Sequence, residues 1–295
     1  MHMISNTLPV IVMTRNDGEY LKQCIESIFN TVKMPITVYI VDNNSDSQEH
    51  LDIVASISSR FESVRVVYNK QNLWVLGLNK TINSIRDLHV SKYFFLTDAD
   101  IDFSKCETPN RCWLSYLTEK MDENLVVGKL GLSLNWDYIS TQPDFFDIYK
   151  QEKSLYNESR KINELYISQV DTTACLFRID WSIESSGGLY PDHMRYLRPE
   201  LYSCRTPKNI TVEHLGWYKY HKNALPQKQI NDKVICFTIV GASLKDEIRS
   251  QASFLVRKFS YFFTQPFLYF WVLRRYCMLA RYIWCHGRRC FDGQK

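Results

Sequence analysis

Two carboxylates spaced two residues apart, Asp98 and Asp100, are the part of this sequence best suited to chemistry. They directly follow the apolar run Tyr93–Thr97, which is typical of a buried parallel strand. Open α/β sheets bind their ligands just beyond the carboxyl ends of such strands. Two acids beside a buried strand are costly unless a cation joins them. A hard divalent cation that holds a diphosphate would meet this need.

Polar clusters also follow two earlier apolar segments. The triplet Thr14-Arg15-Asn16 follows the first segment, and Asp42 follows the second, Ile36–Val41. Because parallel strands end at the same edge of a sheet, all three clusters are expected to lie together. The sequence contains no Walker A loop and no GxGxxG loop. The diphosphate is therefore predicted to be held by a metal ion rather than by a glycine-rich loop.

The spacing of apolar residues predicts the elements that position these clusters. Strands are expected over residues 8–13, 36–41, 64–68 and 93–97, with helices over 20–29, 48–60 and 77–88. This alternation predicts an α/β fold with a mainly parallel sheet flanked by helices. The pattern weakens later, where we expect strands over 126–134, 170–179 and 210–215 and a helix over 145–165.

Taken in order along the chain, these blocks resemble family 2 glycosyltransferases of the GT-A fold. The resemblance rests on Pro9–Asn16, on Val41–Asp46, on Asn72 with Gly77 and Asn79, and on Thr97–Asp100. It implies a nucleoside-diphosphate sugar as donor and Mn²⁺ or Mg²⁺ as cofactor. The family usually carries an arginine close to the glycine, whereas this chain has Lys80, a point charge that cannot replace a bidentate arginine fully.

The resemblance also implies roles for the residues that hold the nucleotide. Thr14, Arg15 and Asn16 would contact the nucleotide, and Asp42 would contact the base. Asn72 would lie on the base or ribose side.

A metal site is implied as well. Asp98 would contact the ribose or the metal, and Asp100 would bind the metal directly. Several GT-A enzymes complete the site with a late histidine, and the stretch around His214 looks like that element. An imidazole beside carboxylates suits Mn²⁺. The alternative for His214 is an ordinary hydrogen-bonded histidine.

The general base is the least defined part of the site. Family members that invert the anomeric carbon usually carry a Glu-Asp pair, but residues 196–200 contain none. The candidates are Asp171, Asp192 and Glu200, in that order, because an inverting transferase needs a carboxylate to deprotonate the acceptor hydroxyl. A retaining enzyme would not need this group, so both stereochemical outcomes stay open.

The charge is concentrated at the C-terminal end. Residues 249–295 contain nine Lys or Arg and one acid, whereas the other 248 residues carry 27 Lys or Arg and 31 Asp or Glu. Basic residues alternate there with Trp, Tyr and Phe, as in helices that lie on membrane surfaces. The longest apolar run, 266–273, is far shorter than the roughly 20 residues that a spanning helix needs. Pro266 predicts a break or a kink.

These features predict a GT-A domain over residues 1–248 and a helical, basic and aromatic tail over 249–295. The domain would comprise a nucleotide-sugar half, 1–104, and an acceptor half, 105–248. The nine cysteines are scattered without zinc spacing, and residues 1–7 do not read as a signal peptide. We expect a cytoplasmic protein, peripheral on the membrane face, that does not bind nucleic acid.

The predicted function is metal-dependent transfer of a sugar to a hydroxyl of a glycan or a lipid-linked glycan. The family context suggests surface polysaccharide or lipopolysaccharide synthesis. A sugar nucleotidyltransferase is the first alternative, but it would normally show a glycine-rich basic loop where this chain has residues 14–18. A non-catalytic subunit that binds nucleotide sugars is the second, because the Glu-Asp pair is absent.

Overall fold

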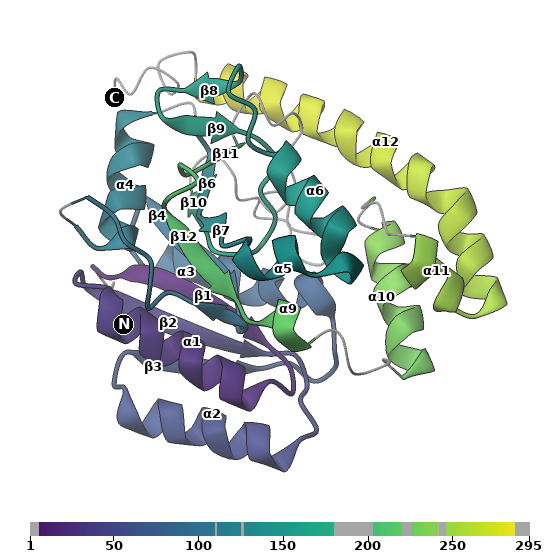
Figure 1. Cartoon of the computed structure of the whole chain (residues 1–295), viewed down its shortest axis with the longest axis horizontal. Coiled ribbons are helices and arrows are strands. Elements are labelled where there is room, and N and C mark those ends of the chain that lie inside the picture. Colours follow the sequence, from purple (N-terminus) through teal and green to yellow (C-terminus); the bar gives the residue numbers. More distant parts are fainter. Residues whose placement is uncertain are drawn as a thin grey trace. The chain divides into compact units, whose positions relative to one another are not determined.

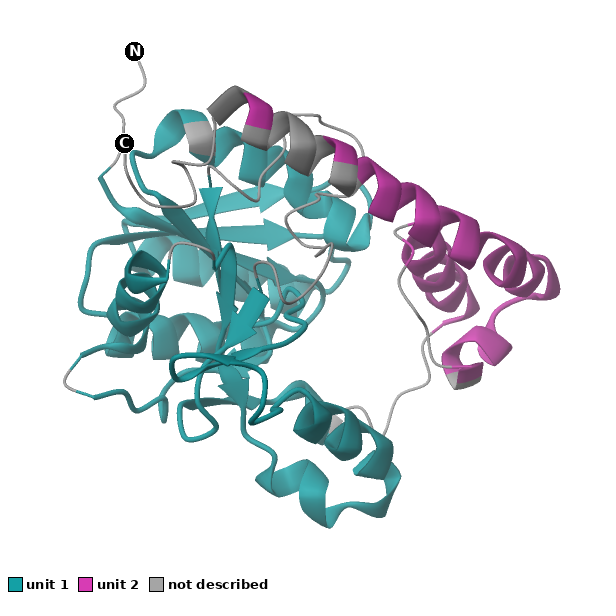
Figure 2. Ribbon diagram, turned by 90° about the horizontal axis from the view of Figure 1, so that it is seen from above, with its two compact units in different colours: residues 1–220 teal, residues 221–295 magenta. Residues whose placement is uncertain are grey.

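The computed structural model describes residues 6–109, 111–124, 127–179, 203–219, 226–239, 241 and 246–286. The chain forms two compact units, residues 1–220 and 221–295 (Figure 2). The domain boundary predicted after residue 248 falls inside the second unit.

Four parallel strands and the helices between them build the N-terminal half of the first unit (Figure 1). The strands are β1 (Leu8–Thr14), β2 (Ile36–Asp42), β3 (Val64–Tyr68) and β4 (Tyr93–Asp98). The helices are α1 (Gly18–Thr31), α2 (Gln48–Arg60), the short 3-10 helix η1 (Trp74–Leu78) and α3 (Asn79–Leu88). Every residue of β2 is buried, as expected for a central strand rich in Val and Ile. The predicted α/β architecture is confirmed.

The sheet continues into the second half of the unit but becomes mixed. Its order is β3-β2-β1-β4-β10-β6-β11-β9-β8. The added strands are β6 (Lys129–Gly131), β8 (Lys161–Ile162), β9 (Leu165–Ile167), β10 (Cys175–Arg178) and β11 (Ser203–Arg205). β10 lies antiparallel between β4 and β6. The β/α rhythm of the sequence fades at this point because the strands no longer alternate with crossover helices.

A small second sheet lies next to the end of β4. It has the order β5-β12-β7, formed by β5 (Ile101–Asp102), β12 (Thr211–His214) and β7 (Ser133–Leu134). The other helices in the described part of this unit are α4 (Trp113–Glu123), α5 (Asp137–Thr141), η2 (Pro143–Phe145), α6 (Phe146–Ser154) and α9 (Gly216–Lys219).

Buried aromatic rings hold the chain between β4 and α4. The ring of Trp113 stacks on Phe103, with centroids 4.5 Å apart, and lies 4.8 Å from the ring of Phe95. All three side chains are fully buried. They anchor both sides of the segment that carries Asp98 and Asp100, so the two acids project from a rigid base.

The predicted helix over 145–165 is wrong in its second half. α6 ends at Ser154, and the hairpin β8–β9 follows. The Oδ1 of Asn157 accepts a hydrogen bond from the backbone N–H of Ser159 (2.9 Å), a local bond that competes with the helix. Asn163 then adopts φ = 53°, which closes the hairpin.

The second unit is helical, with α10 (Gln227–Ile239), α11 (Asp246–Gln251) and α12 (Phe254–His286). Its small core contains Ile230, Val234 and Ala252. Of the break or kink predicted at Pro266, the break is wrong, because α12 continues through this residue. Pro266 has no N–H to donate to the carbonyl of Phe262, one turn earlier in the helix. Among the described residues, no helix has both the length and the apolar character needed to cross a membrane.

Candidate active site

The polar clusters that follow β1, β2 and β4 do meet at one edge of the sheet. Thr14 pairs with Asp42 in the register of β1 and β2, and Met13 pairs with Asp98 in that of β1 and β4. Backbone hydrogen bonds continue past the strand ends, from Ala99 N to Met13 O (3.0 Å) among others. The edge therefore presents side chains from three separate loops over the width of three strands.

Asn16 ties the first two loops together. Its φ of 55° lies in the left-handed region, which asparagine tolerates. Its Oδ1 accepts hydrogen bonds from the backbone N–H of Asp46 (3.0 Å) and of Ser47 (3.1 Å). Its Nδ2 donates to Oδ1 of Asp46 (2.6 Å). In this structure Asn16, which is predicted to contact the nucleotide, links the loops after β1 and β2 by hydrogen bonds.

Asp42 is buried, and hydrogen-bond donors surround its carboxylate. Oδ2 accepts from the backbone N–H of Ser45 (3.0 Å), and Oδ1 accepts from the Ser45 hydroxyl and lies 3.1 Å from Nε2 of His50. Burial acts to raise the pKa of Asp42, but the hydrogen bonds from His50 and Ser45 outweigh it and lower the pKa. Sequence reasoning missed His50, although it follows Asp42 by eight residues at the start of a predicted helix.

A network of amides forms the wall after β3. Asn69 Nδ2 donates to Oδ1 of Asn43 (2.9 Å) and to the carbonyl of Gly77 (3.1 Å). A Cβ on Gly77 would clash with both amides, lying 2.6 Å from Nδ2 of Asn69. Glycine is therefore required for this close approach. Asn72 accepts from the backbone N–H of Trp74 (3.0 Å), so it shapes the same loop.

Two predicted nucleotide contacts keep unused donors. The Oγ1 of Thr14 and the Nε of Arg15 are shielded from solvent and have no hydrogen-bond partner among the described residues. Lys80, the residue in place of the family's arginine, is exposed at the start of α3. A guanidinium and a hydroxyl beside the loop of Asn16 are suited to phosphate or ribose oxygens.

Asp98 stands in a crowded acidic environment. Its partial burial and the neighbouring charge of Asp100 raise its pKa to about 7, and Asp171 adds to this shift. The hydroxyl of Thr173 donates to Oδ2 of Asp98 (2.8 Å) and, together with the charge of His214, opposes the rise. Sequence reasoning missed Thr173, which lies in the turn before β10.

His214 reaches the acids through strand pairing. β12 pairs antiparallel with β5, which places His214 opposite Ile101, and Leu215 N donates to the carbonyl of Asp100 (2.7 Å). Nδ1 of His214 lies 3.9 Å from Oδ2 of Asp100, which is too far for a hydrogen bond. This nitrogen has no hydrogen-bond partner among the described residues. Burial lowers the pKa of His214 despite the nearby carboxylates, which favours the neutral imidazole.

The imidazole is held in place by stacking. The ring of Trp217 lies parallel to that of His214, with centroids 4.8 Å apart and planes within 7°. Trp217 is itself buried. This contact fixes the orientation of the imidazole beside the acids.

Asp171 lies beside the same group but is exposed. Its Oδ1 accepts from the backbone N–H of Thr173 (3.0 Å), the residue whose hydroxyl reaches Asp98. Its charge raises the pKa of both Asp98 and His214. The structure thus brings Asp171 to the acid cluster. The other two candidate bases, Asp192 and Glu200, lie outside the described residues.

The sequence profile of Glycosyl transferase family 2 matches residues 10–177, just over half of the chain. The chain belongs to this family. The predicted resemblance is confirmed, and the matched segment contains all the candidate site residues except Asp192, Glu200 and His214. Among proteins of curated function, none matches the sequence significantly.

Solved structures of similar shape are distant from this family 2 chain in sequence. The mannosyltransferase PcManGT from Pyrobaculum calidifontis, solved with GDP-Man and Mn²⁺, is 14% identical, with a TM-score of 0.49 over 99% of this chain and 88% of its own. S. aureus TarS is 14% identical, with a TM-score of 0.45 over 83% of this chain. The alignment covers 42% of the length of TarS.

The side chains present fit a divalent metal in kind. Within the described residues, no group of three or more His, Cys, Asp or Glu side chains is already arranged as a metal cage. The charge of Asp100 nevertheless raises the pKa of Asp98, and the imidazole nitrogen of His214 lies near these acids without a hydrogen bond. Carboxylates and a neutral imidazole are ligands that Mn²⁺ accepts.

Proposed function

We propose that this family 2 chain is a metal-dependent glycosyltransferase that moves a sugar from a nucleoside-diphosphate sugar to a hydroxyl. One observation carries the proposal: β12 brings His214 against Asp100 at the sheet edge where the loops after β1 and β2 also end. A nucleotide pocket and a cation site would then be adjacent, as a diphosphate donor requires.

In this proposal Thr14 and Arg15 bind the nucleotide with their unused donors. Asp42, fixed by His50 and Ser45, defines the base side of the pocket. Asp98, Asp100 and His214 hold Mn²⁺ or Mg²⁺. The bound metal supplies Lewis acidity that neutralises the diphosphate leaving group.

Asp171 is proposed to act on the acceptor. It is exposed, so an acceptor hydroxyl can reach it, and the backbone N–H of Thr173 holds one of its oxygens. A carboxylate in this position would accept the proton of the hydroxyl during attack on the anomeric carbon, which gives inversion. Asp192 is the second choice for the same role.

We further propose that the acceptor is a glycan or a lipid-linked glycan at the cytoplasmic membrane face, in surface polysaccharide or lipopolysaccharide synthesis. The support is the basic and aromatic composition of residues 249–295. A peripheral enzyme would lie at the membrane surface, where a lipid-linked acceptor is located.

The proposal is tested with the purified full-length chain and a panel of nucleoside-diphosphate sugars. We expect release of nucleoside diphosphate that depends on one or a few donors, needs Mn²⁺ or Mg²⁺, and stops when the metal is chelated. Isotopically labelled donor sugar should appear in the acceptor fraction of a lipid extract.

Two results would overturn this proposal in favour of its alternatives. Formation of a nucleotide sugar from a nucleoside triphosphate and a sugar phosphate would indicate a nucleotidyltransferase. Tight donor binding without release of nucleoside diphosphate, for any metal and any extract, would indicate a non-catalytic binding subunit.

A further inference from the structure

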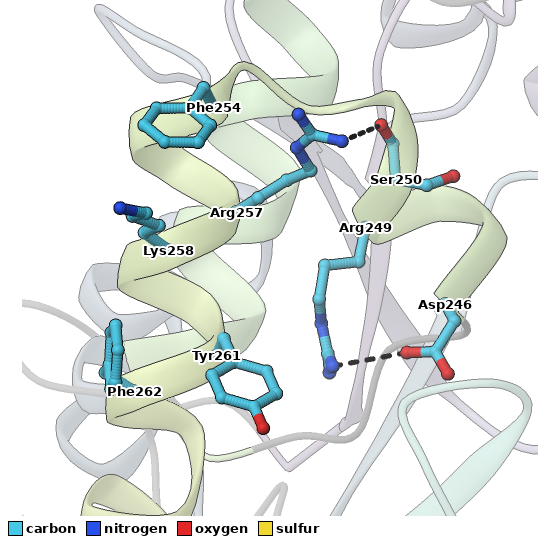
Figure 3. A pocket seen from close by; sticks show the side chains of 8 residues that line it. All are labelled: Asp246, Arg249, Ser250, Phe254, Arg257, Lys258, Tyr261 and Phe262. Carbon is cyan, nitrogen blue, oxygen red and sulfur yellow. Dashed lines mark hydrogen bonds and ion pairs between the residues drawn. The ribbon is translucent and has the colours of Figure 1, made fainter.

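An open pocket of about 430 Å³ lies in the second unit, between α11 and the first turns of α12 (Figure 3). Its volume falls within the range of small-ligand pockets. Arg249 comes from α11, whereas Arg257, Lys258 and Tyr261 come from α12. The glycosyl transfer proposed above does not use these residues.

The pocket is positively charged and retains unused donors. Three of its residues are basic, and Asp246 is its one acid. Nη1 of Arg249 donates to Oδ1 of Asp246 (3.2 Å), but its Nε is shielded from solvent and has no hydrogen-bond partner among the described residues. Nη1 of Arg257 lies 3.5 Å from the carbonyl of Ser250, a long contact that a better acceptor would displace. Guanidinium groups in such a position favour phosphate.

Aromatic side chains border these charges. The Nζ of Lys258 lies 4.5 Å from the ring centre of Phe254. Phe262 lies one turn after Lys258 on α12 (Figure 3). Phe254 is 59% exposed and Phe262 is 64% exposed. Large apolar groups that stay this exposed next to basic residues are typical of helices that lie at a membrane interface.

The opposite face of α12 is already used for packing. Ser260, Thr264 and Trp271 are buried, and Nε1 of Trp271 donates to the carbonyl of Ile239 in α10 (2.8 Å). The exposed face therefore cannot turn inward without breaking these contacts. It continues along the helix to Tyr269, which is 70% exposed. An apolar stripe of this kind usually marks an interaction surface.

We propose that this pocket binds the phosphate group of an anionic phospholipid while the exposed aromatic side chains of α12 enter the headgroup region of the bilayer. The charge selects an anionic lipid surface over an apolar protein partner, because the apolar stripe is bordered by Arg257 and Lys258 rather than by acids. The inference rests on the membrane location included in the proposed function and names the site that would produce it.

The test is co-sedimentation of the full-length chain with vesicles of phosphatidylcholine, with and without phosphatidylglycerol. Wild type should bind the anionic vesicles and bind neutral vesicles weakly. The triple variant Arg249→Gln, Arg257→Gln, Lys258→Gln should lose roughly 100-fold in partition, from about fivefold for each basic residue near the surface.

A control with the same charge change replaces three exposed lysines of the first unit, Lys33→Gln, Lys105→Gln and Lys150→Gln. It should change the partition by less than about threefold. If the triple pocket variant is unfolded by circular dichroism, the single variant Lys258→Gln should still show the fivefold loss, because the ammonium of Lys258 lies over the exposed ring of Phe254 and its replacement leaves the core intact.

Competition with inorganic phosphate distinguishes a site for a lipid phosphate group from a site for free phosphate. Inorganic phosphate, compared with sodium chloride of equal ionic strength, should not release the protein from anionic vesicles, because it cannot replace the aromatic contacts with lipid. Release at millimolar phosphate would indicate a free-phosphate site, and equal binding of wild type and pocket variants would also overturn the proposal. Vesicle binding needs neither donor nor metal, so this test and the transferase assay fail independently.

Discussion

Two neighbouring parts of the same sheet edge differ in the groups that surround their carboxylates. At the end of β2, Asp42 is surrounded by donors from Ser45 and His50, and its pKa is lowered. At the end of β4, Asp98 faces other acids, and its pKa is raised to about 7. The two carboxylates end β2 and β4, which lie on either side of β1 in the parallel part of the sheet.

The difference indicates which part of the edge needs a ligand. The loop after β2 satisfies its buried carboxylate without a ligand, so it forms a preorganised wall of the site. The acid cluster carries a cost in the free protein that a cation would remove. We infer that stability and function are separated along this edge, with the first part supporting the fold and the second part bearing the chemistry.

The largest effect is expected at Asp171, on the acidic side. Replacement Asp171→Asn should lower the rate of transfer by about 100-fold or more, since a general base contributes roughly 10²–10⁴-fold. Donor affinity, measured by isothermal titration calorimetry, should stay within about threefold. Near-normal turnover of this variant would assign the base to Asp192 instead.

Asp100→Asn should follow closely. If Asp100 binds the metal as proposed, its loss is expected to lower metal-stimulated release of nucleoside diphosphate by about 100-fold, equal to roughly 3 kcal/mol of the barrier. The control is Asp102→Asn, two residues later, whose side chain bonds Gln23 (2.8 Å) and the Ser104 N–H (2.8 Å). Equal losses in both variants would remove Asp100 from the metal site.

On the satisfied side, His50→Leu should reduce the free energy of unfolding by about 1–3 kcal/mol, because it leaves buried Asp42 short of one donor. His50→Gln, which keeps an N–H donor, should lose less. The lowered pKa of Asp42 stabilises the fold above the ordinary value of 3.8. This stabilisation is lost as pH falls through the lowered pKa, so urea unfolding at pH 7 and pH 3 should show the gap between wild type and His50→Leu shrinking.

The smallest effect concerns Asp98 and has the opposite sign. In chelator, Asp98→Asn should stabilise the chain by about 1 kcal/mol, or a few degrees in Tm, because it removes repulsion from Asp100 and Asp171. The raised pKa of Asp98 destabilises the folded state in full above about pH 7 and not at all below 3.8. The gain in stability of Asp98→Asn should therefore appear only at the higher pH.

The control for this variant is Asp87→Asn, which changes an exposed acid on α3 and should leave Tm unchanged. Addition of Mn²⁺ should raise the Tm of wild type more than that of Asp98→Asn, since ligand binding stabilises the folded state. A wild type that is more stable than Asp98→Asn in chelator would contradict the comparison between the two acids.

Much of the first half of the fold could be predicted because its signals are local. The strands are continuous apolar runs, and Asp42 and Asp98 each stand where a run ends, so their meeting at one edge follows from parallel pairing. Beyond residue 104 the strands are two to four residues long, too short for a periodic signal. The hairpin β8–β9 therefore leaves no strand signal in the sequence, and no local pattern predicts that α12 continues through Pro266.

The sequence by itself determined the family, the parallel half of the sheet and the position of the acids along the chain. Only the tertiary structure decided which partners these acids receive. His50 and Thr173 reach Asp42 and Asp98 from other elements, and His214 reaches Asp100 through the pairing of β12 with β5. The physical reason is that the contacts of Thr173 and His214 depend on packing between segments 75 to 113 residues apart, which no local pattern of residues encodes.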